Sequence, residues 1–224
     1  MGFELSIGDA PAAQPQSDIF DAMADALAGP GWGVFPNPLR SDVLQNLSDI
    51  AHAQEFCAPA KIGRRLNQRR NSQIRRDKIV WIDSSHPSQQ NWLDWNAQLQ
   101  LRLNRSLMMG LSFFESHYAY YAPGAFYAKH LDVFQGANQE MLSERAVSAV
   151  LYLNPHWMPG HGGELVLYGP TGDVLTEVAP CMGTMVLFNS ADFLHEVRPT
   201  REPRFSIAGW FHRQPASAVA LPVA

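Results

Sequence analysis

The feature that most constrains the fold is a succession of short β-type segments in the C-terminal half of the chain. Runs rich in Val, Leu, Ile, Phe and Tyr alternate there with turns that contain Gly, Pro and Asn. Short strands with turn signals between them are typical of an antiparallel sandwich or barrel. The predicted strands cover residues 113–121, 125–132, 146–153, 164–168, 174–178, 184–188, 194–198 and 204–212.

The N-terminal half has a different pattern. Apolar residues recur at helical spacing in three segments, near residues 17–28, 41–51 and 91–109, and short strands are expected at 32–35 and 79–82. With 224 residues, of which 46% are hydrophobic, the chain fits one globular domain. We predict a flexible tail over residues 1–16 and a single domain over 17–224. Within it, residues 17–112 would give helical support and a basic loop, and residues 113–213 the β core.

Charge is unevenly distributed along the chain. The net charge is −4, yet eight of the 17 Lys and Arg residues lie in one basic stretch (Lys61–Lys78), where Asp77 is the only acid. This stretch carries +7 and the remainder −11. A chain this acidic elsewhere is a poor general polyanion binder, so a nucleic-acid partner is not expected. Because the basic stretch lacks a consistent apolar face, it is predicted to be a loop.

Cysteine content and hydropathy bear on the compartment. The two cysteines, Cys57 and Cys181, are too few for a disulfide framework, which favours a reducing compartment. No run approaches the roughly 18 consecutive apolar residues of a membrane helix, and the N-terminus lacks the basic and apolar regions of a secretory leader. We therefore expect a cytoplasmic location and no membrane partner.

A candidate metal site stands out in the β-rich half. In a strand, side chains two positions apart project from the same face, so His130 and Asp132 are expected to point together into the barrel. His195, near the start of a later strand, is well placed to add a third ligand. Two His and one carboxylate form the facial triad of non-haem Fe(II) oxygenases. Tyr121 and Tyr127 flank the approach to His130 and are expected at the mouth of the pocket.

An inward-facing arginine supports this interpretation. Strand parity puts Arg204, Ser206 and Trp210 on one face. A buried guanidinium is costly unless it meets an anion, and a co-substrate carboxylate would satisfy it with bidentate geometry. Tyr152 is either a second hydroxyl for that carboxylate or an ordinary core tyrosine whose hydroxyl bonds the backbone.

These residues combine into a longer pattern with a known counterpart. The motifs are Tyr121-x-x-Gly124-x-x-Tyr127-x-x-His130-x-Asp132, Arg145 before Leu151-Tyr152-Leu153-Asn154, Gly162-Gly163-Glu164-Leu165, His195-Glu196-Val197, and Arg204 with Trp210. Upstream, Ile74-Arg75-Arg76-Asp77-Lys78-Ile79-Val80-Trp81-Ile82 is similar to a segment Ile-Arg-Gly-Asp-Lys-Ile-x-Trp. Over residues 73–213 the chain resembles the 2-oxoglutarate and Fe(II)-dependent dioxygenases of the prolyl 4-hydroxylase superfamily. It is most like the hypoxia-inducible-factor-type prolyl hydroxylases and their bacterial relatives.

The resemblance implies a fold and a reaction. The fold would be mainly β with N-terminal helices, and residues 113–213 would form a double-stranded β-helix, the jelly-roll or cupin-like core of an oxygenase domain. The cofactors would be Fe(II), 2-oxoglutarate and O2, with L-ascorbate as an auxiliary. The enzyme would oxidatively decarboxylate 2-oxoglutarate to succinate and CO2 and hydroxylate a prolyl residue in a protein or peptide substrate. The bacterial members suggest a translation elongation factor as that substrate.

The resemblance also implies roles for individual residues. It implies that Asp77 lies near the iron-bound water, Arg75 at the substrate-facing edge, and Trp210 beside the co-substrate. The expected sets are iron ligands His130, Asp132 and His195; co-substrate residues Arg204, Tyr152, Tyr121, Leu165 and Trp210; catalytic residues Asp77 and Tyr121; and substrate residues Arg75, Arg76 and Tyr127. Arg76 stands where the family has Gly, which permits backbone angles that Arg adopts only at a cost, so we expect the loop path and peptide preference to differ.

Other functions remain open at the level of sequence. Demethylation of nucleic acid would account for the basic stretch, but such relatives usually carry a second Arg six residues after the co-substrate Arg, where this chain has Trp210. Hydroxylation of a free amino acid or small molecule would need its own carboxylate clamp, for which Arg75 and Arg145 are the candidates. A non-catalytic binding module and a zinc hydrolase are further alternatives, although no general-base Glu accompanies the ligands. For a protein substrate, Lys61–Arg70 would form a mobile loop that steers an acidic segment to the pocket.

Overall fold

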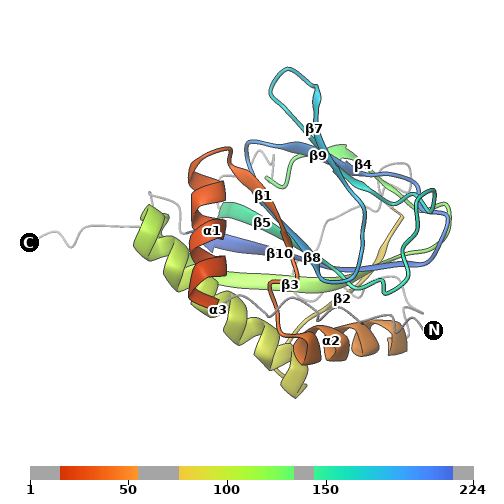
Figure 1. Ribbon diagram of the computed structural model, residues 1–224, viewed down its shortest axis with the longest axis horizontal. Coiled ribbons are helices and arrows are strands. Elements are labelled where there is room, and N and C mark those ends of the chain that lie inside the picture. The colour runs from red at the N-terminus through yellow and green to blue at the C-terminus, as the bar shows by residue number, and fades with distance from the viewer. Residues whose placement is uncertain (1–15, 55–75, 134–143, 214–224) are drawn as a thin grey trace, which may run out of the picture.

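The computed structural model describes residues 16–54, 76–133 and 144–213, and all structural statements concern these residues (Figure 1). They form helices at the N-terminal side and a β-rich C-terminal half, as the sequence predicts. The elements are α1 Gln16–Ala28, β1 Trp32–Pro36, α2 Ser41–Ala53, β2 Lys78–Trp81, α3 Pro87–Leu107, β3 Leu111–Tyr121, β4 Tyr127–His130, β5 Glu144–Tyr152, β6 Leu165–Tyr168, β7 Val174–Val178, β8 Thr184–Asn189, β9 Leu194–Val197 and β10 Arg204–Arg213.

The strands form two antiparallel sheets. One sheet has the order β1-β8-β5-β10-β3-β2, and the other has the order β4-β9-β6-β7. From β3 to β10 the chain passes back and forth between the two sheets, which is the path of a jelly roll. The predicted double-stranded β-helix core is therefore confirmed.

The large sheet has an apolar layer on each face. In β5 and β10, Leu151, Ile207 and Phe211 join the cluster that packs against the helices, while Tyr152 joins the cluster between the two sheets. Helix α1 contacts β1 and β8, α2 contacts β10, and α3 contacts β3. Figure 1 shows the three helices along the large sheet, away from β4, β7 and β9. Because the alternation of side chains directs one set to the helices, the other set is free to line the space between the sheets.

Helix α3 begins four residues before the predicted start at residue 91. Pro87 occupies its first turn, where the missing N–H costs nothing, and the His86 ring accepts a hydrogen bond from the Ser88 backbone N–H at 3.2 Å. The helix ends at Met108, which has a left-handed backbone conformation with φ 52°. The start was missed because a histidine is an uncommon N-cap residue.

Several predicted segments lie outside the described residues. They include the tail at residues 1–15 and most of the basic stretch, with Arg75 among its residues. Gln16, assigned to the tail, opens helix α1. Within the described part of the chain, none of the helices combines the length and apolarity needed to cross a bilayer.

Candidate active site

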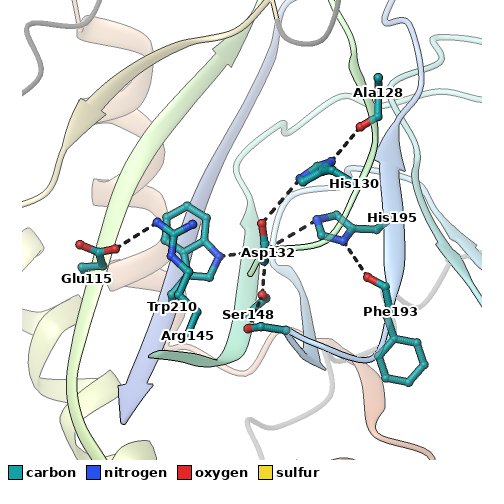
Figure 2. Close-up of polar contacts among 10 residues, drawn as sticks. Glu115, Ala128, His130, Asp132, Arg145, Ser148, Phe193, His195 and Trp210 are labelled. Atoms are coloured by element: carbon teal, nitrogen blue, oxygen red, sulfur yellow. Dashed lines mark hydrogen bonds and ion pairs between the residues drawn. The ribbon is translucent and has the colours of Figure 1, made fainter. Parts of the chain in front are cut away.

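The three predicted metal ligands converge between the sheets. His130 ends β4 and faces His195 of β9 in the strand ladder, and Asp132 follows β4 by two residues. The Nε2 atom of His130 lies 3.6 Å from Asp132 Oδ1, and that of His195 lies 3.6 Å from Asp132 Oδ2. The ligand atoms of all three residues lie within 4.8 Å of one another (Figure 2). Such a set can hold one metal ion and leaves coordination positions open.

Backbone carbonyls orient both imidazoles. The Nδ1 atom of His130 is 2.8 Å from the Ala128 carbonyl oxygen, and that of His195 is 3.1 Å from the Phe193 carbonyl oxygen. A carbonyl only accepts, so each Nδ1 carries a proton and each Nε2 is the ring nitrogen that faces the ligand cluster, the arrangement that metal binding through Nε2 requires. Tyr127 stacks on the His130 ring at 3.6 Å. Burial lowers the pKa of His195, which keeps its imidazole neutral.

Asp132 accepts two hydrogen bonds on one oxygen. Oδ2 receives the Ser148 hydroxyl at 2.8 Å and the Trp210 indole N–H at 2.9 Å (Figure 2). Burial by itself raises the pKa of the Asp132 carboxyl, but its interactions with His130, with His195 and with the Trp210 N–H outweigh that effect. The pKa of Asp132 therefore lies well below its usual range, and the group is a carboxylate at neutral pH.

Arg204 is buried and has no counter-ion among the described residues. It is 1% exposed, its Nε donates to the Gly163 carbonyl at 2.9 Å, and an Nη donates to Ser206 Oγ at 3.1 Å. No ion pair joins it to any of the Asp and Glu side chains that the structure describes. The guanidinium lies 4.8 Å from the Tyr121 ring centre. A buried cation of this kind needs an anion, and a small carboxylate fits the remaining donors.

Tyr152 has a buried hydroxyl that makes no hydrogen bond with the described residues. Its ring centre is 5.2 Å from the Arg204 guanidinium, and burial raises the pKa of the phenol to about 12. The backbone partner that the core-tyrosine alternative requires is therefore not found among the described residues. A protonated hydroxyl beside a guanidinium without a counter-ion fits the carboxylate of 2-oxoglutarate, since both would gain a partner.

The remaining predicted residues lie at varied distances from the ligands. Leu165 is buried in the cluster between the sheets. Asp77 is buried just before β2, and the β2–β3 register, continued by one residue, puts it beside Tyr121. Arg76 is exposed, with its guanidinium 5.3 Å from the Phe126 ring centre.

Trp210 contacts a metal ligand directly, and sequence reasoning did not anticipate this contact. Its indole donates to Asp132, and the Arg145 guanidinium lies 3.6 Å above its ring. Ser148 was also missed as a partner of Asp132. Strand parity puts Ser148 on the same face as Tyr152, so the inward direction was readable from the sequence. The partner was not readable, because Asp132 lies outside any strand register.

Comparison with known proteins agrees with this geometry. A family model described as the 2OG-Fe(II) oxygenase superfamily matches residues 116–212. The crystal structure of a Pseudomonas putida prolyl-4-hydroxylase is 36% identical, with a TM-score of 0.75 over 88% of this chain and 100% of that chain. A Trichoplax adhaerens prolyl hydroxylase in complex with a hypoxia inducible factor peptide fragment is 23% identical, with a TM-score of 0.72 over 88% of this chain and 90% of that one, and supports the fold.

A curated relative covers a shorter region. The prolyl 3-hydroxylase OGFOD1 of Xenopus laevis is 31% identical over 84 residues, which span 34% of this chain and 16% of that protein. The site and the similarity along the whole Pseudomonas chain define the class: this chain belongs to the 2OG-Fe(II) oxygenase superfamily. Within it, the chain groups with the prolyl 4-hydroxylases, as the sequence motifs predicted.

Proposed function

We propose that the protein is an Fe(II)- and 2-oxoglutarate-dependent dioxygenase that hydroxylates a prolyl residue, at carbon 4, in a protein or peptide. The observation that carries this proposal is the coexistence of two features between the same sheets. One is a triad of His, Asp and His, and the other is a buried arginine that has no counter-ion in the part of the chain that the structure describes. A metal hydrolase would need the first feature and would have no use for the second.

Three residues of the chain would form the metal site. His130, Asp132 and His195 would hold Fe(II) through two imidazole nitrogens and one carboxylate oxygen. Fe(II), bound with 2-oxoglutarate and O2, supplies the oxidising chemistry that couples decarboxylation of the co-substrate to hydroxylation of a C–H bond. The protein ligands would occupy one face of the metal and leave the opposite face to the small molecules.

The co-substrate would be fixed at its far end by two residues. Arg204 would pair with the distal carboxylate, and the Tyr152 hydroxyl would donate to it. Tyr121 and Leu165 would line the same pocket, since Tyr121 lies opposite Arg204 in the β3–β10 ladder and Leu165 belongs to the apolar cluster between the sheets. Burial strengthens these charge-assisted contacts because water does not compete for the donors.

The substrate would approach from the side of β4 and the segment before β2. Tyr127 covers His130, Arg76 is exposed near Phe126, and the basic stretch continues from Arg76 towards the N-terminus. Arg75, Arg76 and Tyr127 are proposed as substrate-binding residues, and Asp77 and Tyr121 as catalytic ones. The positive charge of the basic stretch suits an acidic protein segment around the proline.

Two residues count against the alternatives. For hydroxylation of a free amino acid, the candidate carboxylate clamps are Arg75, which lies outside the described residues, and Arg145, whose guanidinium donates to Glu115 at 3.1 Å and stacks on Trp210. A demethylase would carry a second Arg where Trp210 donates to Asp132. An elongation factor as the substrate, L-ascorbate as an auxiliary reductant and a cytoplasmic location complete the proposal.

The test is turnover of the co-substrate. Purified protein with Fe(II) and O2 is expected to release succinate from 2-oxoglutarate, and His130→Ala is expected to abolish that release because only two metal ligands remain. His161→Ala is a matched control, since His161 lies on a turn and contacts Trp157. Succinate release that survives His130→Ala, or hydrolysis of a substrate without 2-oxoglutarate, would overturn the proposal.

A further inference from the structure

The metal carboxylate is held by its own set of donors. We propose that Trp210 and Ser148 position Asp132 for metal binding, so that Trp210 acts on the metal ligand rather than as a wall of the co-substrate pocket. The inference rests on the proposed function in that it takes the triad to be the metal site. It adds a role for Trp210 and Ser148 that the ligand motif does not contain.

Both donors act on the same oxygen. The Trp210 N–H and the Ser148 hydroxyl reach Asp132 Oδ2 at 2.9 and 2.8 Å. Ser190 lies 2.8 Å from Ser148 Oγ. Because Ser148 gives its only hydroxyl proton to Asp132, Ser190 must donate to Ser148. Oδ1, which lies 3.6 Å from His130 Nε2, is left as the carboxylate oxygen for the metal.

The sheet itself sets the positions of these groups. Trp210 of β10 lies opposite Ser148 of β5 on one side and opposite Glu115 of β3 on the other. The three side chains therefore form one row across three strands, at the spacing that strand pairing dictates. Asp132, which follows β4 without being in a strand, lies against this row and is fixed by its hydrogen bonds (Figure 2).

An ion pair keeps the indole in place. The Arg145 guanidinium lies 3.6 Å from the Trp210 ring centre, and it donates to Glu115 Oε1 at 3.1 Å. His212 holds the same carboxylate oxygen at 3.1 Å. On another side, the His117 ring centre lies 5.4 Å from that of Trp210. The indole is thus confined with its N–H directed at Asp132, and a cation over an aromatic face adds to that confinement.

The polar and ring contacts of Trp210 are directed at the metal end of the site. Its N–H donates to Asp132, its ring lies under the Arg145 guanidinium, and the His117 ring lies beside it. Mutating a residue that hydrogen-bonds a metal ligand typically lowers metal affinity 10- to 100-fold. Trp210 should therefore affect metal binding, whereas a pocket wall would affect 2-oxoglutarate binding.

The test compares Trp210→Phe with Trp92→Phe. Trp92 is a matched control because it is buried and its indole N–H donates to Ser116 Oγ at 3.0 Å, in the layer against the helices. Mn(II) affinity is measured by titration, with the concentration of free Mn(II) determined by electron paramagnetic resonance. We expect Trp210→Phe to weaken Mn(II) binding about 10-fold. At saturating Mn(II), 2-oxoglutarate affinity should stay within about 2-fold of the parent's, and Trp92→Phe should leave both unchanged.

Ser148→Ala gives a second route if Trp210→Phe does not fold. It removes the other donor to Oδ2, so it should also weaken Mn(II) binding and alter the visible absorption spectrum of bound Co(II), which reports the ligand arrangement. Parent-like Mn(II) affinity and Co(II) spectra in these variants would overturn the inference. So would weaker 2-oxoglutarate binding with metal binding intact. Normal Mn(II) binding by a parent that releases no succinate would instead count against the proposed function alone.

Discussion

The buried polar side chains of the site differ in how far the protein satisfies them. Asp132 receives two hydrogen bonds from the chain, and the imidazoles of His130 and His195 each have a backbone partner. Among the described residues, Arg204 has no anionic partner and the Tyr152 hydroxyl has no hydrogen bond. A folded protein rarely leaves such groups unsatisfied unless a ligand completes them. The protein therefore satisfies the side chains of the proposed metal site by itself, whereas those of the proposed co-substrate site still need a partner.

This difference predicts the behaviour of Tyr152→Phe. The substitution removes a hydroxyl that stabilises nothing in the free protein, so the free energy of unfolding should be unchanged or slightly higher. Affinity for 2-oxoglutarate should fall about 10-fold, as expected on losing a hydrogen bond to a charged group. Tyr118→Phe is the control, since its hydroxyl is also buried without a hydrogen bond among the described residues but belongs to the layer against the helices. Equal 2-oxoglutarate affinity in the two variants would contradict the assignment.

Glu115 makes a contribution to folding stability that depends on pH. Burial raises the pKa of its carboxyl, but His212 and Arg145 outweigh that effect, so the pKa lies below its ordinary value. The unfolded chain then binds a proton at a higher pH than the folded one. The stabilisation is present at neutral pH and is lost as pH falls below about 4 and through the folded pKa.

Glu115→Gln tests this linkage. The variant should be less stable than the parent by about 1 kcal/mol at neutral pH, a modest value because the ion pair is partly exposed. The difference should shrink as pH is lowered below about 4, the ordinary pKa of a glutamate, because the unfolded chain then takes up a proton that the folded chain still excludes. Urea unfolding at a series of pH values measures it. A difference that does not change over this acidic range would show that the ion pair contributes nothing to stability.

At the level of elements, strand pairing brings the site together. The pairing of β4 with β9 places His130 opposite His195, and the row across β5, β10 and β3 supplies the donors for Asp132. The connection before β6 contributes a backbone group, because the Gly163 carbonyl accepts from Arg204 at 2.9 Å. Both ends of the site thus depend on positions that pairing or a tight turn fixes.

Gly163→Ala is a test of that connection. Gly163 has φ +71°, and a Cβ there would lie 3.0 Å from Arg204 Cδ and 3.2 Å from Thr200. The alanine should therefore displace Arg204 and lower 2-oxoglutarate affinity severalfold while Mn(II) affinity is unchanged. Gly172→Ala is the control, since φ is +87° but a Cβ would meet nothing within 4 Å. Both variants should lose about 1–2 kcal/mol of stability from backbone strain. A parent-like 2-oxoglutarate affinity for Gly163→Ala would show that the close packing of Gly163 against Arg204 does not set the position of the guanidinium.

Sequence periodicity predicted the elements well where one face of each is apolar. The strands of the jelly roll appear within a few residues of the predicted limits, and parity correctly separated Arg204 and Ser206 from Ile207 and Phe211. The ligand triad followed from spacing within one segment plus one distant histidine. The partners Ser148 and Trp210 did not follow, because a contact between two strands and a residue after a third depends on sheet order, which no local pattern encodes.

For the whole molecule, the two apolar clusters lie on opposite faces of the large sheet and contribute differently to the site. The helices and the outer face of the large sheet form one cluster, and the facing surfaces of the two sheets form another that includes Tyr121, Tyr152 and Leu165. The helix layer holds the large sheet in shape without using the inward face. That inward face is left to carry the polar residues of the site, and the comparison with the Pseudomonas enzyme shows the same architecture along the whole of that chain.

The central claim, prolyl hydroxylation of a protein, is tested most directly by following an oxygen atom. A cell lysate is treated with the enzyme, Fe(II) and 2-oxoglutarate under isotopically labelled O2, and its peptides are analysed by mass spectrometry. We predict that a prolyl residue gains one labelled oxygen atom, and that His130→Ala and omission of 2-oxoglutarate each abolish the gain. Label that appears only on a free amino acid or a nucleobase, or succinate release with no labelled proline, would contradict the account.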